Sequence, residues 1–156
     1  MKFLKIFIIV LILLLVGFFL YIDLNKKEVT KIDISKINRT VIGIGQINLM
    51  LYSLGAYELH NPPLSKDTPK IEIVIGNEVY SAEIINKAFS TKKASINNAD
   101  LRITTSREEF LACLNSDIKT CIQKSVRDGK TKIETISDST ELALKGYLSL
   151  YQEQSS

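Results

Sequence analysis

The chain has 156 residues, of which 46% are hydrophobic and 24% charged, and its formal net charge is +3. Lys2 and Lys5 precede the first acidic residue, Asp23, so the remaining chain carries 18 basic and 17 acidic residues. This balance, without a basic stripe, excludes a typical nucleic-acid-binding protein. Two cysteines are too few for a disulfide-dense scaffold or a cysteine-based metal site.

The N-terminus carries a long uncharged segment. The 17 residues from Ile6 to Ile22 include no charged side chain, and as a helix they would extend roughly 26 Å, close to the ~30 Å thickness of a bilayer core. The alternative, a cleaved signal peptide, would have a shorter apolar core followed by small residues, and Phe18–Ile22 offers none. We therefore predict an uncleaved transmembrane signal-anchor over residues 1–24 and a stalk over residues 25–39.

Lysines lie on both sides of this segment, and more of them follow it than precede it. Charge alone therefore leaves its orientation open. The short N-terminus, with lysines directly before the apolar run, is typical of secretory signals. We predict a single-pass membrane protein whose domain lies outside the cytoplasm, with the membrane as a partner.

A second apolar segment, Thr40–Leu59, has the character of a helix. Gln46 and Asn48 would be costly in the middle of a bilayer, which favours a buried helix of the domain. An interfacial helix or a second membrane span is the alternative. Pro62 and Pro63 cannot continue the helix and therefore end it.

Short β-rich runs come next. Ile71–Ile75 and Val79–Ile85 flank a turn over residues 76–78, which predicts a hairpin. A further turn leads to Ala88–Ser90, and Asp100–Thr104 is typical of another short strand.

Helices are predicted after these strands. Ser106 and Glu109 form a capping box that opens a helix to about Leu114, and residues 115–117 break it before a second helix that runs to about Arg127.

The last elements are a strand, Thr131–Ile136, and a helix, Ser139–Gln152, which opens on a capping box of Asp138 and Glu141. One stripe of this helix is apolar and faces the predicted core, and it consists of Leu142, Ala143, Gly146, Tyr147 and Leu150. More apolar residues lie beside it than one core face requires, namely Leu144, Leu148 and Tyr151.

Cys113 and Cys121 are eight positions apart, which along a continuous helix is about 12 Å. Folding back at residues 115–117 would bring their Cα atoms within the ~4.4–6.8 Å that a disulfide needs. A disulfide and a pair of small buried side chains both remain open. Neither Cys-x-x-Cys spacing nor accompanying histidines support a metal site.

No catalytic constellation is evident. His60 is the single histidine, and neither a Gly-x-Ser-x-Gly motif nor a phosphate-binding loop is present. We therefore predict a protein that is not an enzyme and has no cofactor.

The run GKTKI at residues 129–133, followed by LALK at 142–145, is similar to the closing pattern of the sterol carrier protein 2-like (SCP2-like) family. The order of elements over residues 71–151 resembles that family too. The resemblance implies a five-stranded sheet covered by helices that enclose an apolar ligand, with no catalytic residues to carry over. The chain departs from the family after Ile136, because it proceeds directly to a helix where the family usually has a second strand.

The expected fold class is α+β: an N-terminal transmembrane helix, then a single domain over residues 40–152 with a mostly antiparallel sheet packed with helices, then a tail over 153–156. The expected function is binding of a lipid or other apolar molecule by a membrane-anchored domain. The alternative is a structural or interaction domain of a membrane or cell-surface assembly, with a protein partner. Apolar side chains that would contact the ligand, or else fill an ordinary core, are Phe110, Leu114, Leu144, Leu148 and Tyr151.

Overall fold

The computed structural model describes residues 38–148 and 150. The predicted signal-anchor, nearly all of the predicted stalk, Tyr151 and the predicted tail lie outside the described residues. None of the helices in the described part has the length and apolar character that crossing a membrane requires.

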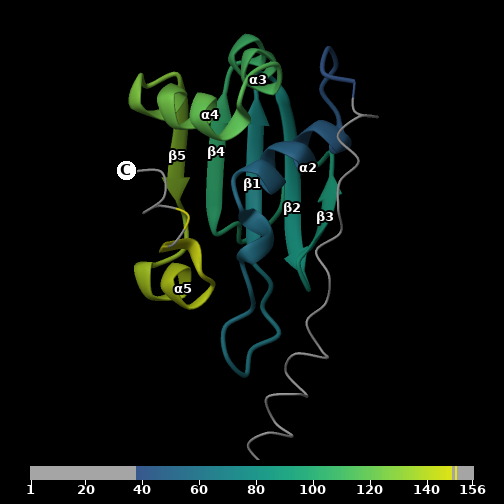
Figure 1. Cartoon of the computed structure of the whole chain (residues 1–156). Helices are drawn as coiled ribbons and strands as arrows, with labels where there is room; N and C mark the ends of the chain where they lie inside the picture. The colour runs from purple at the N-terminus through teal and green to yellow at the C-terminus, as the bar shows by residue number, and fades with distance from the viewer. Residues whose placement is uncertain (1–37, 149, 151–156) are drawn as a thin grey trace, which may run out of the picture.

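A five-stranded sheet in the order β3-β2-β1-β4-β5 forms the centre of the domain (Figure 1). β1 pairs in antiparallel fashion with β2, as β2 does with β3 and β4 with β5, whereas β1 and β4 run parallel. The α+β class is confirmed, and the sheet is mixed. The strands are β1 (Lys70–Ile75), β2 (Glu78–Ile85), β3 (Ala88–Lys92), β4 (Leu101–Thr105) and β5 (Thr131–Thr135).

One face of the sheet carries the core. Side chains alternate between the two faces of a strand, so Ile71, Ile73 and Ile75 of β1 share one face, and all three are buried. The helices α2 (Ile44–Ser53) and α4 (Ile118–Arg127) lie over this face (Figure 1). The apolar positions of the strands therefore pack against the helical layer.

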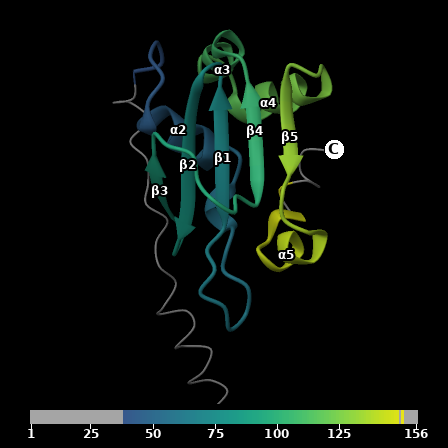
Figure 2. The ribbon, with the colours of Figure 1, turned by 180° about the vertical axis from the view of Figure 1, so that it is seen from behind.

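The opposite face is polar. Glu72 of β1 accepts a hydrogen bond from Arg102 of β4 at 2.6 Å, and only 5% of Glu72 is exposed. The β3–β4 connection crosses this face (Figure 2), where the backbone N–H of Ile96 donates to Glu72 at 3.4 Å. This connection carries the chain to β4, which is the parallel neighbour of β1.

The segment Thr40–Leu59 forms α2 and a short 3-10 helix, η2 (Ala56–Glu58), and it packs inside the domain. Both polar residues that made a membrane location costly are hydrogen-bonded. Gln46 donates to the backbone carbonyl of Asn38, and Asn48 accepts from the hydroxyl of Thr91. Of the two alternatives left open by the sequence, the structure shows the buried helix.

The helix starts predicted from the sequence are confirmed. The Ser106 hydroxyl accepts a hydrogen bond from the Glu109 backbone at the start of α3 (Arg107–Leu114). Asp117 accepts the corresponding bond from the Thr120 backbone at the start of α4. Asp138 accepts two such bonds at the start of α5 (Ser139–Leu144).

The predicted continuous helix Ser139–Gln152 is wrong, because α5 ends at Leu144. Gly146 has a φ of +86°, a left-handed conformation that glycine adopts without the steric cost of a side chain and that commonly ends helices. His60 packs beside this turn, and its backbone N–H donates to the Lys145 carbonyl at 3.2 Å. The chain after Gly146 therefore takes a new direction.

Candidate functional site: an apolar cavity and a buried ion cluster

A small apolar cavity of about 30 Å³ lies between the sheet and the helical layer. Strands β1, β4 and β5 contribute one side, α2 and η2 contribute another, and the segment after α5 closes it. Its lining residues are Leu51, Leu54, Ala56, Ile71, Leu101, Ile103, Ile133, Tyr147 and Leu150.

The cavity is far smaller than a typical ligand pocket. A volume of about 30 Å³ has room for only about two water molecules, whereas small-molecule sites commonly measure roughly 300–1,000 Å³. An apolar guest of any size therefore enters only if a wall moves.

Leu150 forms the part of the cavity wall that borders the surface. It is half-buried, and it also lines an outer cleft of about 250 Å³ that includes Tyr52 and Tyr57. The two tyrosine rings stack with their centroids 5.0 Å apart. Leu150 thus separates the apolar cavity from a more polar cleft at the surface.

A buried ion cluster lies beside the cavity, at the end of the sheet where β1 and β4 begin. Its centre is Lys145, of which 1% is exposed. The Lys145 ammonium lies 2.7 Å from Asp100, 2.6 Å from Asp67 and 2.7 Å from Glu141. We call this group the Asp100–Lys145 cluster, and its members are Asp67, Lys70, Asp100, Ser137, Glu141, Lys145 and Tyr147.

Asp100 is fully buried and accepts hydrogen bonds from several elements. The backbone N–H of Lys70 donates to it at 2.7 Å, the Ser137 hydroxyl at 2.9 Å and the Tyr147 hydroxyl at 3.1 Å. A buried carboxylate is tolerated only when it is paired and hydrogen-bonded. The cluster meets that condition and ties the start of β1 to the last part of the described chain.

Two members of the cluster, Lys145 and Asp67, have shifted pKa values that favour their charged forms at neutral pH. Burial disfavours the charged Lys145 side chain, but hydrogen bonds to Asp100, Asp67 and Glu141 outweigh that effect and raise the pKa of its ammonium. Hydrogen bonds from Lys145 and then from Lys70 lower the pKa of Asp67 to about 2. A general acid or base works best with a pKa near the operating pH, so these two groups suit structure rather than proton transfer.

Tyr147 belongs to both features. Its ring lines the cavity, and its hydroxyl donates to Asp100. The ion cluster therefore fixes one part of the cavity wall, whereas Leu150, four positions beyond α5 and its terminal turn, packs through apolar contacts.

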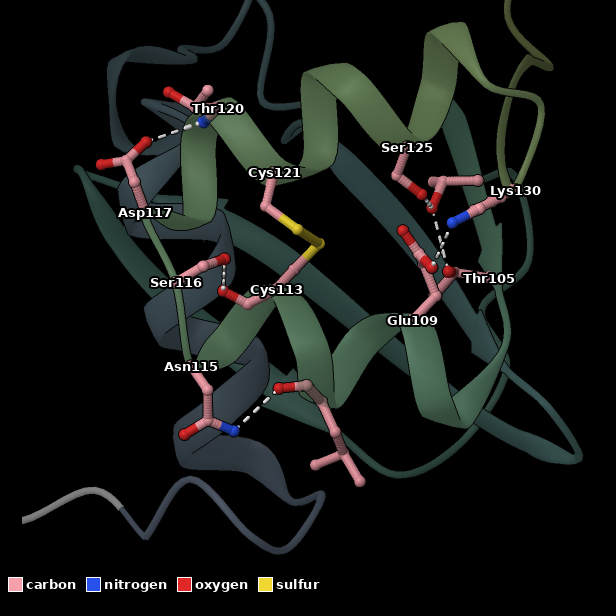
Figure 3. Close-up of a disulfide and its surroundings, with 12 residues drawn as sticks. Thr105, Glu109, Cys113, Asn115, Ser116, Asp117, Thr120, Cys121, Ser125 and Lys130 are labelled. Atoms are coloured by element: carbon pink, nitrogen blue, oxygen red, sulfur yellow. Dashed lines mark hydrogen bonds and ion pairs between the residues drawn. A yellow bond between two sulfur atoms is a disulfide. The ribbon is translucent and has the colours of Figure 1, made fainter.

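The disulfide between Cys113 and Cys121 joins α3 to α4 (Figure 3), and their Cα atoms are 5.2 Å apart. The break at residues 115–117 lets the chain fold back, as the sequence predicts. Glu109 lies near both sulfur atoms, but a disulfide leaves no thiolate to bind a metal. The Glu109 carboxylate instead faces Lys130 at 3.5 Å.

The structure does not bring the predicted ligand-contacting residues together. Phe110 and Leu114 on α3 are buried in the core, whereas Leu144 and Leu148 are 47% and 50% exposed. None of these four lines the cavity, and Tyr151 lies outside the described residues. The turn at Gly146 is the reason, because Leu144 and Leu148 no longer lie on one continuous helix.

Sequence reasoning missed the role of the apolar stripe in this helix. Tyr147 and Leu150, which it places in the core, are the residues that close the cavity. Their spacing of three positions was the available signal, since such residues share one face of a helical turn.

No protein-family model matches the chain, and no curated protein matches it. Similar solved structures include a sec-alkyl sulfatase, 11% identical with a TM-score of 0.43, which matches 75% of this chain and only 17% of its own. The palmitated SCP2L2 of Aedes aegypti is 16% identical with a TM-score of 0.41, over 70% of this chain and 96% of its own. Sterol carrier protein 2 of Yarrowia lipolytica is 15% identical with a TM-score of 0.37, over 75% and 99%. Two of these three similar structures carry the name of the family that the sequence resembles.

Proposed function

We propose that this chain is a membrane-tethered, non-enzymatic domain that binds a lipid or another apolar molecule between its sheet and its helical layer. The observation that carries the proposal is the apolar cavity, one wall of which, Leu150, also borders a surface cleft. Movement of that single side chain would join the two spaces and admit an apolar chain.

The energetics of this opening are moderate. Exposing a buried leucine costs roughly 1.5–3 kcal/mol, and burying one methylene gains about 0.8 kcal/mol. Leu150 is only half-buried, so exposing it costs about half as much, and about one to two methylenes of a guest in its place would offset the loss. Tyr147 would stay in place, because its hydroxyl is bonded to Asp100.

Two features support the tether and the location. The uncharged run from Ile6 to Ile22 has the length of a membrane anchor. The disulfide between Cys113 and Cys121 favours an oxidising compartment, and hence a domain outside the cytoplasm. The Asp100–Lys145 cluster has a structural role in this proposal, because its central ammonium is held by three carboxylates.

Ligand binding is tested by native mass spectrometry of the full chain in detergent, followed by titration with a fluorescent fatty acid. Co-purifying mass of lipid size supports the proposal. Leu150→Ala, which enlarges the cavity, should tighten probe binding, and Ala56→Leu, which fills it, should weaken binding. Leu148→Ala is the matched control, since Leu148 is exposed and does not line the cavity. A stably empty protein that binds no probe would contradict the proposal.

The location is tested by thiol labelling of intact cells. Lys124→Cys places an accessible thiol on α4, where the side chain is exposed. A membrane-impermeant maleimide should label it, whereas protection in intact cells and labelling after lysis would place the domain in the cytoplasm.

A second candidate function is that of an interaction domain, which the exposed side chains of Leu144 and Leu148 favour. Both belong to one short stretch of chain, and a protein partner would cover them. Cross-linking from Leu148 in the membrane of intact cells distinguishes this candidate, because only an interaction domain would yield a discrete protein adduct there.

A further inference from the structure

Two loop tips lie at the same end of the sheet. Residues 60–66 follow η2 and lead toward β1, and residues 85–87 join β2 to β3. The end of β2 is held beside the segment before β1, because the Ile84 backbone donates to the Pro69 carbonyl at 2.9 Å. We call residues 60–66 and 85–87 together the loop end (Figure 1).

Each tip presents an apolar side chain to solvent. Leu64 is fully exposed and has a φ of +63°, a conformation that is uncommon for residues other than glycine. Ile85 is 42% exposed at the end of β2. Exposed loop tips often carry small or polar residues, so these two neighbouring tips share an apolar feature.

The two tips also carry like charge. Their sequences, HNPPLSK and INK, include no acidic residue, and the side chains of Lys66 and Lys87 are both exposed. A cleft of about 560 Å³ lies between the tips and is lined by His60 and Asn61 on one tip and residues 85–87 on the other. Glu58, also in its lining, belongs to η2 rather than to either tip.

We propose that the loop end docks on the surface of an anionic glycerophospholipid bilayer. Leu64 and Ile85 enter the interfacial region, while Lys66 and Lys87 lie beside lipid phosphates. Charge complementarity selects this occupant, because each basic residue near an anionic membrane adds attraction that one apolar residue alone does not provide. Two separate apolar side chains on tips suit a fluid surface better than they suit a protein partner, which favours a contiguous apolar patch.

Docking does not require the cavity to be a ligand site. It rests on the proposed tether only for proximity, since the 15 residues between Ile22 and Asn38 span at most about 54 Å. Docking would turn the cleft between the tips toward the lipid headgroups.

The chain has no tryptophan, so a single introduced indole reports on one position. The full chain with Leu64→Trp is reconstituted into vesicles whose phosphatidylcholine and phosphatidylglycerol carry brominated acyl chains. We expect a blue shift of the emission and quenching by the bromine atoms. Val41→Trp is the matched control, because Val41 is 48% exposed and lies near Arg39, whose carbonyl accepts from Asn115 at the opposite end of the sheet. Its emission should stay unquenched.

The contribution of the two lysines to docking is tested by substitutions in the Leu64→Trp variant. Lys66→Gln and Lys87→Gln should each lower the ratio of docked to undocked chains about fivefold, and Lys124→Gln on α4 should leave it unchanged. Vesicle flotation reports the tether separately. A chain that floats while the tryptophan remains in water overturns the docking and leaves the tether intact. Equal quenching of both tryptophans, or quenching that does not respond to the two lysines, also overturns it.

Discussion

Two regions of the domain, at opposite ends of the sheet, hold their helices in place by different kinds of interaction. At one end of the sheet, the disulfide between Cys113 and Cys121 holds α3 and α4 together. At the other end, the Asp100–Lys145 cluster holds α5 and the segment after it to the starts of β1 and β4. The first attachment is covalent and depends on the redox environment, whereas the second is electrostatic and depends on protonation. The two attachments should therefore be lost under different conditions.

The largest expected effect concerns the ion cluster. Lys145→Met leaves Asp100 buried without its cation, and removing one partner of a buried ion pair costs about 3–5 kcal/mol. The free energy of unfolding, measured by urea titration and circular dichroism in detergent, should fall by that amount. Lys132→Met is the control, because Lys132 pairs with Glu134 at the surface, and exposed pairs contribute about 0–1 kcal/mol. Equal losses in both variants would show that the cluster contributes no more than a surface pair.

Loss of the disulfide should have the next largest effect on the free energy of unfolding. Its cysteines are 8 positions apart, and closing so short a loop stabilises a protein by roughly 2–3 kcal/mol in the chain-entropy model. Replacing both cysteines, Cys113→Ser with Cys121→Ser, should lower the free energy of unfolding by that amount and abolish the response to dithiothreitol. The Lys145→Met variant should keep its response to the reductant. If it loses that response, the two ends are coupled rather than independent.

The helix caps allow a finer comparison of the two ends. Asp117 accepts one backbone hydrogen bond at the start of α4, and Asp138 accepts two at the start of α5. Each change to alanine should cost about 1 kcal/mol, with Asp138→Ala the larger. Urea titration measures both. A smaller loss for Asp138→Ala would show that the ion cluster, rather than the cap, holds α5 in place.

The smallest expected effect is a change in how the free energy of unfolding depends on pH. Hydrogen bonds from Lys145 and Lys70 lower the pKa of Asp67 from 3.8 to about 2. Because the folded-state pKa lies below the unfolded value, this group contributes stability that is present above about pH 4 and is lost as the pH falls through about 2. Unfolding measured between these values should show a weaker pH dependence in Asp67→Asn. The variant without cysteines should keep the dependence of the original chain.

The two ends also differ in what the sequence could foretell. The break at residues 115–117 and the nearby cysteines are local signals, and they made the observed bridge one of two alternatives that the sequence left open. The hairpin and all three helix caps are local too, and all are found in the structure. Such elements depend on residues within a few positions of one another.

The ion cluster depends on residues far apart in the chain. Asp100 receives its hydrogen bonds from residues 30, 37, 45 and 47 positions away, and neither periodicity nor spacing records such partners. Two pairs within the cluster leave a local trace, because Glu141 and Lys145 are four positions apart and Asp67 and Lys70 are three positions apart. The parallel pairing of β1 with β4 escaped prediction for the same reason. The cavity was not predicted either, because the wall that closes it lies beyond the turn at Gly146, which was not predicted from the sequence.

The order of translation has a consequence for the Asp100–Lys145 cluster, because the cluster can form only after the strands of the sheet have been synthesised. All five strands are complete at Thr135, and both cysteines precede it. A nascent chain could therefore assemble its sheet and oxidise its thiols while Asp100 still lacked its cation. Lys145 arrives ten positions later and neutralises that charge. A product truncated before it would bury the Asp100 carboxylate without a cation beside it, which would destabilise that product and favour its proteolysis.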